Sequence, residues 1–227
     1  MTLREKLLEK VPDAPGWVEF RSALLDGGPA FGTVDNYVVV SPTGALVCVA
    51  GEPARAALQE ALLLRPNYGD ILARPESRTA VELVLGRPGV RAVIHACEEP
   101  SWEAELTADV RVLSPGHEDA FEHVALPLRP ELIDGLSSSG VATAFVDGRA
   151  AGFCYAVAVT ETHWDVAVDT LEPYRRRGLA QAAFTTMAAA MAGRGQRPVW
   201  GAKETNAASL EMAKKLGFRP AEELLIW

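Results

Sequence analysis

The chain of 227 residues carries 30 acidic and 22 basic side chains, which gives a formal net charge of -8. This acidic balance argues against non-specific nucleic-acid binding, which needs a basic face. Hydrophobic residues make up 48% of the chain and charged residues 23%, so the composition favours a buried core over disorder.

The three cysteines, Cys48, Cys97 and Cys154, are widely spaced in apolar runs, so we expect buried thiols in a reducing cytoplasm. The N-terminal stretch MTLREKLLEK is charged and lacks the apolar centre of a signal peptide. No segment approaches the roughly 18 apolar residues of a membrane span. The sequence therefore predicts a cytoplasmic protein without membrane or nucleic-acid partners.

The first half of the chain mixes helices and strands. Its patterns predict helices over residues 3–11, 17–25, 52–64 and 77–86, a hairpin over 36–51, and a strand over 90–97. The stretch has no motif that identifies a function. We expect residues 1–107 to form a smaller α/β domain that supplies part of a binding pocket, shields the sheet or mediates a homodimer.

The second half, residues 108–227, has a clearer pattern. A strand over 109–113 is followed by a hairpin over 142–159 that turns at Asp147-Gly148, a strong hairpin signal. Then come a strand over 163–171, a helix over 178–192, a strand over 198–202, a helix over 206–216 and a strand over 221–227. This order predicts an α/β fold with a mixed central sheet flanked by helices. The first half also has a hairpin in a comparable place, so it could be a decayed copy of the opening of the second.

The stretch YRRRGLAQAA, Tyr174 to Ala183, is electrostatically unusual because three arginines stand at a predicted helix start. A helix N-terminus carries partial positive charge and prefers anions. Gly178 and Ala180 are small, so an anion can approach the backbone closely there. A bound pyrophosphate would make the cluster favourable, since arginine is well suited to phosphate. The alternative is a solvated arginine patch.

The spacing Arg175-x-x-Gly178-x-Ala180 resembles the (Gln/Arg)-x-x-Gly-x-(Gly/Ala) motif of the GNAT superfamily of N-acetyltransferases. The stretch NAASLEMAKKLGF, Asn206 to Phe218, resembles the family's next motif, and the strand RPVWGA lies between them. The resemblance covers roughly residues 108–227 and is strongest from Thr170 to Phe218. It implies a GNAT-like fold and an acetyl-coenzyme A-dependent transfer of an acetyl group to a primary amine by direct attack in a ternary complex.

The resemblance also implies the cofactor site. A backbone N–H near Val168 to Thr170 would polarise the acetyl carbonyl, and Thr170 and Leu171 would lie along the pantetheine arm. The pyrophosphate would be held by the turn and helix start, and the pantetheine by Asn206 with help from Ser209. An alternative role for Asn206 is a helix N-cap. The full set of predicted cofactor-binding residues is Val168, Thr170, Leu171, Arg175, Arg176, Arg177, Gly178, Leu179, Ala180, Asn206 and Ser209.

Within the family the general base often comes from the strand before this turn, so the resemblance makes His163 and Asp165 the catalytic candidates. Glu161 and Asp169 are weaker candidates for the same role. Strand alternation places His163, Asp165 and Asp169 on one face and Trp164 on the other. The alternative is that they are solvent-facing polar positions. Family members often carry a tyrosine as general acid where this chain has Ala213. A non-catalytic acyl-coenzyme A-binding module and a longer acyl donor therefore stay open.

No set of histidines and cysteines has metal-ligand spacing, so no metal is expected. The expected partner is a small-molecule or peptide amine.

Overall fold

The computed structural model of the chain describes residues 1–65, 69–97 and 108–227. The residues form two compact units. The first unit contains Met1–Ala96, Ala158–His163 and Val199–Trp227, and the second contains Cys97–Val157 and Trp164–Pro198. In this grouping the C-terminal segment Val199–Trp227 belongs with the N-terminal part of the chain, whereas the sequence predicted one domain over 1–107 and another over 108–227. The predicted division into domains stays a prediction.

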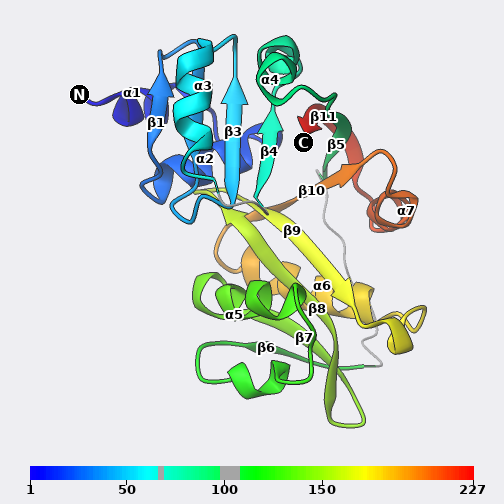
Figure 1. Ribbon diagram of the computed structural model, residues 1–227. Coiled ribbons are helices and arrows are strands. Elements are labelled where there is room, and N and C mark those ends of the chain that lie inside the picture. Colours follow the sequence, from blue (N-terminus) through cyan, green and yellow to red (C-terminus); the bar gives the residue numbers. More distant parts are fainter. Residues whose placement is uncertain (66–68, 98–107) are drawn as a thin grey trace. The chain divides into compact units, whose positions relative to one another are not determined.

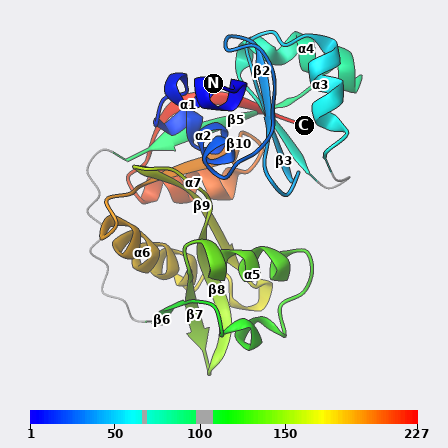
Figure 2. The same ribbon diagram turned by 90° about the vertical axis from the view of Figure 1, so that its left-hand side faces the viewer.

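The first unit is built on a mixed sheet (Figures 1 and 2). Its strand order is β1 (Ala30–Gly32), β2 (Tyr37–Val40), β3 (Leu46–Ala50), β4 (Asp70–Ala73), β11 (Arg219–Ile226), β5 (Val90–Ala96) and β10 (Arg197–Lys203, from Val199 on). β3 and β4 run parallel, and the pairs β1/β2, β2/β3, β4/β11, β11/β5 and β5/β10 run antiparallel.

Helices cover both faces of this sheet. On one face α1 (Leu3–Lys10) and α2 (Val18–Leu25) pack against Tyr37 and Val39. On the other, α3 (Arg55–Leu62) and α4 (Arg78–Leu85) pack against Val38 and Val40. The alternation along β2 therefore buries every one of its residues, as expected of a strand covered on both sides. The remaining helix of this unit is α7 (Ala207–Lys215).

The second unit has the strand order β9 (His163–Thr170, from Trp164 on), β8 (Arg149–Val159, to Val157), β7 (Val141–Val146) and β6 (Asp109–Leu113). β7 and β8 form the predicted hairpin, with positive φ angles at Asp147 and Gly148. The helix α5 (Leu128–Ser138) packs on Phe153 and Tyr155. The start of α6 (Leu179–Ala192) packs on Ala144 and Ala151.

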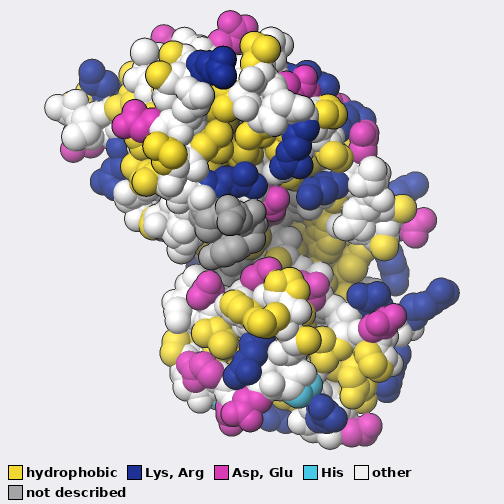
Figure 3. Space-filling model, in the orientation of Figure 1, with side chains coloured by type: hydrophobic (Ala, Val, Ile, Leu, Met, Phe, Trp, Pro, Cys, Tyr) yellow, Lys and Arg dark blue, Asp and Glu magenta, His cyan; other side chains and the backbone are white. Residues whose placement is uncertain are grey.

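The structure confirms the predicted helices, hairpins and strands to within a few residues at each end. The sequence patterns missed β1, β4 and α5. On the face shown in Figure 3, basic and acidic side chains are interspersed. Among the described residues, no helix combines the length and the apolar character that crossing a bilayer requires.

Candidate functional site

The turn from β9 to α6 holds the residues predicted to bind pyrophosphate. After β9 ends at Thr170, the single turn η4 (Glu172–Tyr174) leads to Gly178, which is the N-cap of α6. Arg176 has a φ of 61° and Gly178 a φ of 77°, both in the left-handed region. Glycine adopts this region at little cost, whereas arginine is strained there. The backbone conformation therefore explains why glycine stands at the N-cap.

The start of α6 is open to an anion. No side chain caps this helix, so no described side chain accepts from its first N–H groups as an N-cap would. A Cβ built on Gly178 would meet no atom within 4 Å. A helix of 14 residues whose uncapped N-terminus borders open space has the features of a phosphate site.

The three arginines leave their positive charge available. Arg175, Arg176 and Arg177 are exposed, and none of them forms an ion pair within the described part of the chain. The Nε of Arg175 donates to the Thr170 carbonyl at 3.2 Å, which braces the turn. The guanidinium of Arg177 lies 6.0 Å from the centre of the Tyr174 ring. The turn thus carries arginines without ion-pair partners among the described residues, beside a helix start that no side chain caps, and these residues fit a pyrophosphate.

Leu179 contributes to this site through packing. Its side chain is buried against Ala144 and Ala151, so only its backbone is available to a ligand. A Cβ built on Gly152 of β8 would lie 2.9 Å from the Leu179 Cβ. Gly152 therefore allows the helix start to approach the strand closely. Sequence reasoning missed this residue, and a glycine inside a strand pattern was the available signal.

The strand β9 precedes the turn, and the side chains at its start alternate between the two faces of the sheet as predicted. Trp164 is fully buried and stacks on Phe184 of α6, with ring centres 6.4 Å apart. Val168, Thr170 and Leu171 are half-buried. The face of β9 that carries Trp164 is therefore the one that packs against α6.

Asp169, on the opposite face of β9, lies near Glu131 and Tyr155. Burial raises the pKa of Asp169 above its usual value, and the charge of Glu131 adds to this. The Tyr155 hydroxyl donates to Glu131 Oε2 at 2.7 Å. Burial and this hydrogen bond raise the pKa of Tyr155 well above that of a free phenol. A tyrosine held in this way is a poor replacement for the general acid missing at Ala213.

Asn206 and Ser209 lie in the first unit, whereas residues 168–180 lie in the second. Asn206 is the N-cap of α7, and its Oδ1 accepts from the Ser209 N–H at 3.2 Å. Ser209 Oγ accepts from Trp200 Nε1 at 2.9 Å. Asn206 therefore fills the N-cap role that the sequence left open, and its role in cofactor binding stays a prediction.

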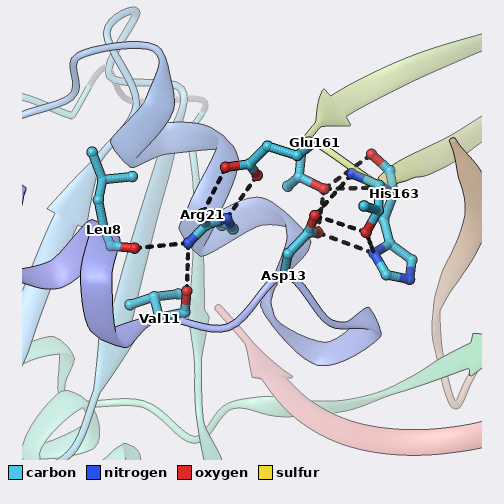
Figure 4. Close-up of polar contacts among 8 residues, drawn as sticks. Leu8, Val11, Asp13, Arg21, Glu161 and His163 are labelled. Carbon is cyan, nitrogen blue, oxygen red and sulfur yellow. Dashed lines mark hydrogen bonds and ion pairs between the residues drawn. The ribbon is translucent and has the colours of Figure 1, made fainter. Parts of the chain in front are cut away.

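His163 occupies the first position of β9 and belongs to the first unit. Only 4% of it is exposed, so the alternative of a solvent-facing polar position is wrong for this residue. Its Nδ1 lies 3.0 Å from Asp13 Oδ1, which comes from the turn after α1 (Figure 4). Asp165 is half-buried and belongs to the second unit. The sequence did not indicate Asp13, since it stands 150 residues from His163 within a proline-rich turn.

The carboxylate of Asp13 is a hydrogen-bond acceptor for three residues. Thr160 Oγ1 donates to Oδ1 at 2.6 Å, and the Thr162 N–H and Oγ1 donate to Oδ2 at 2.8 and 2.7 Å. Burial by itself raises the pKa of Asp13, but the hydrogen bonds from Thr160, Thr162 and His163 outweigh it and hold the pKa below its usual value. The ionised form is therefore the one that this site stabilises.

The lowered pKa of Asp13 gives a prediction for acid stability. Because the folded-state pKa lies below the unfolded value, Asp13 contributes stability that is fully present above the unfolded pKa of about 4 and is lost as the pH falls through the folded pKa. Asp13→Asn should therefore lower the free energy of unfolding most at neutral pH, and the difference from the parent should shrink in acid. Urea unfolding at neutral and acidic pH measures this, and a difference independent of pH would contradict it.

Within the described ranges, no three of the His, Cys, Asp and Glu side chains are arranged to hold a metal ion.

Residues 140–226 match a family model described as GNAT acetyltransferase. A search of curated protein sequences finds no match.

Solved structures with this fold match nearly the whole chain. A GCN5-related N-acetyltransferase-like protein from Streptococcus suis is 18% identical, with a TM-score of 0.71 and 99% of each chain covered. A putative GNAT-family acetyltransferase from Novosphingobium aromaticivorans is 20% identical, with a TM-score of 0.64, covering 94% of this chain and 95% of that one. A functionally unknown conserved protein from Staphylococcus epidermidis is 13% identical, with a TM-score of 0.60, covering 88% and 93%.

The likeness to these structures extends the GNAT fold over the first half of the chain, whose role the sequence left open. Over residues 140–226 the chain is therefore similar to the GNAT acetyltransferases, and its fold is that of the solved GNAT structures.

Proposed function

We propose that this protein is an acetyl-coenzyme A-dependent N-acetyltransferase that acts on a primary amine in a ternary complex. The observation that carries the proposal is the uncapped start of α6, where open space beside Gly178 meets three exposed arginines without ion-pair partners. The family match over residues 140–226 supports the same donor.

The residues of the turn would hold the donor. The backbone N–H groups at the start of α6 and the guanidinium groups of Arg175, Arg176 and Arg177 would bind the pyrophosphate. Thr170 and Leu171 would lie along the pantetheine, and a backbone N–H between Val168 and Thr170 would stabilise negative charge on the carbonyl oxygen. Acetyl-coenzyme A, when bound, supplies an acetyl group activated as a thioester.

The chain would also have to handle protons. An alkylammonium has a pKa near about 10, so a base must take one of its protons before the nitrogen attacks. The new bond joins the amine nitrogen to the carbonyl carbon, the carbon–sulfur bond breaks, and the sulfur leaves as a thiolate that is then protonated. His163 and Asp165 are the candidate bases. Positioning the two reactants would supply much of the rate.

The proposal is tested by measuring the release of coenzyme A thiol from acetyl-coenzyme A with four kinds of acceptor: a polyamine such as spermidine, a free amino acid, an aminoglycoside, and a peptide with a free N-terminus. We expect release that depends on both protein and amine. The acceptor class follows from which amine reacts.

A second candidate is a non-catalytic module that binds acyl-coenzyme A. It is favoured by Ala213, which is fully buried where family members often carry a tyrosine acid. Saturable binding of acetyl-coenzyme A without thiol release, across all four kinds of amine, would support this candidate over the enzyme. Repeating the assay with longer acyl donors would test the third possibility, a larger acyl group.

A further inference from the structure

A cavity of about 240 Å³ lies within the first unit, between the end of α1, the β1–β2 loop and the turn η2 (Pro75–Ser77). A cavity of roughly 150 Å³ accommodates a benzene ring, so this one has room for a ring with a short side arm. Apolar side chains form much of its lining, and the charged ones are exposed. The residues that matter for its chemistry are Lys10, Trp17, Val34, Asp35, Tyr37 and Glu76.

Tyr37 of β2 lines this cavity and carries a hydroxyl without a partner. The residue is 3% exposed, and its buried hydroxyl makes no hydrogen bond to any residue that the structure describes. Burial raises the pKa of this phenol well above its usual value, and the carboxylate of Glu76 contributes in the same direction. The hydroxyl therefore lies within range of the Glu76 charge. Because nearly all buried polar atoms are hydrogen-bonded, an orphaned hydroxyl beside a cavity points to a ligand.

The charged groups at this cavity leave one carboxylate without a counter-charge. Lys10 forms an ion pair with Asp35, so these two neutralise one another. Arg74, which packs on the aromatic wall of the cavity, donates to Glu222 Oε2 at 2.6 Å. Glu76 is exposed and forms no ion pair within the described part of the chain. The cavity therefore favours a positively charged ligand over a negatively charged one.

We propose that this cavity binds a small organic cation in which an ammonium group is attached to an apolar ring. The ring would pack against Trp17 and Val34, which form part of the wall. The ammonium would donate to the Glu76 carboxylate and to the Tyr37 hydroxyl oxygen, and the aromatic rings would attract its charge further. All of these residues belong to the first unit, so the inference stands independently of the proposed function.

The test is an NMR chemical-shift titration of the isotope-labelled full chain with phenethylamine at neutral pH, without acetyl-coenzyme A. We expect saturable binding with a Kd on the order of a millimolar or below. The alcohol 2-phenylethanol, which lacks the charge, should bind at least about threefold more weakly, and phenylacetate, which reverses it, at least about tenfold more weakly. Ethylamine should also bind more weakly, because it has no ring to bury.

Two variants and a control assign the binding to this cavity. Glu76→Gln should raise the Kd of phenethylamine about threefold to fivefold, and more at low salt than at high salt. Glu60→Gln, which removes an exposed carboxylate of α3 in the same unit, is the matched control and should leave the Kd unchanged. Tyr37→Phe should raise the Kd about threefold or more. The free Tyr37→Phe protein should unfold at no lower temperature, because the lost hydroxyl has no partner among the described residues.

No saturable binding of phenethylamine at millimolar concentrations would overturn the proposal. So would equal affinities for the amine and the alcohol, since charge would then not be what the cavity selects. An unchanged Kd in both Glu76→Gln and Tyr37→Phe would place the binding elsewhere and overturn it as well. None of these results bears on the binding of acetyl-coenzyme A, so the failure of this proposal can be told apart from the failure of the proposed function.

Discussion

Replacing Gly178 by alanine should weaken acetyl-coenzyme A binding about a hundredfold, which corresponds to about 2.7 kcal/mol. The added Cβ would occupy the open space beside the first N–H groups of α6. A pyrophosphate could then no longer approach closely enough for two charge-assisted hydrogen bonds, each worth roughly 1.5–3 kcal/mol. Calorimetric titration of acetyl-coenzyme A measures the loss.

A glycine near the other end of α6 offers a matched control for Gly178→Ala. Gly195, just beyond the end of α6, has the same φ of 77° and also has no atom within 4 Å of a built Cβ. Gly178→Ala and Gly195→Ala should therefore each cost about 1 kcal/mol of stability, because alanine is strained in this region. Only the first should weaken binding. Equal affinities in the two variants would show that the helix start is not the anion site.

Replacing Arg177 by glutamate should weaken acetyl-coenzyme A binding about tenfold or more, or about 1.4 kcal/mol. The substitution removes a donor and places a carboxylate beside the expected pyrophosphate. Arg177 is the best choice of the three arginines because Arg175 braces the turn through Thr170 and Arg176 has a positive φ. A change at Arg177 therefore disturbs the backbone least.

The control for Arg177 is Arg149→Glu. Arg149 is also exposed, lies at the start of β8 in the same unit, and has no ion-pair partner in the part of the chain that the structure describes. Arg149→Glu changes the net charge by the same amount as Arg177→Glu, but at a position far from the turn in the sequence. If both variants weaken binding equally, and more at low salt than at high salt, the triplet acts only through the general charge of the surface.

The site on α6 could be predicted because its information is local. Arg175, Gly178 and Ala180 stand within six residues, and the helix start and the glycine conformation follow from their own stretch of chain. The hairpin at Asp147-Gly148 was predictable for the same reason, since both residues have the positive φ that such a turn requires. Short-range rules succeed where a feature is encoded by neighbouring residues.

The pairing of Asp13 with His163 could not be predicted because it depends on the tertiary fold. Asp13 stands in the stretch VPDAPG, which by itself indicates only a turn between two helices. The turn at residues 160–162 supplies three of the donors, and nothing in its sequence points to residue 13. For the same reason β4 was missed: its four residues form a strand by pairing with β3 and β11.

The helix α5 was missed for a different reason. Its segment, LRPELIDGLSS, contains a proline and a glycine, both of which lower helix propensity. Leu132 and Leu136 nevertheless bury one face against Phe153 and Tyr155, and this packing outweighs propensity. At Gly135 the helix approaches β7 closely, since a Cβ there would lie 3.0 Å from Val141 Cγ2. Tertiary contacts therefore account for the helix despite its low propensity.

The central claim is that the start of α6 binds the donor of an acyl transfer. Calorimetric titration of the full chain with acetyl-coenzyme A tests it most directly. The account predicts saturable binding with one site per chain, weakened by Gly178→Ala and by Arg177→Glu and unaffected by Gly195→Ala and Arg149→Glu. The absence of binding at millimolar acetyl-coenzyme A would contradict it.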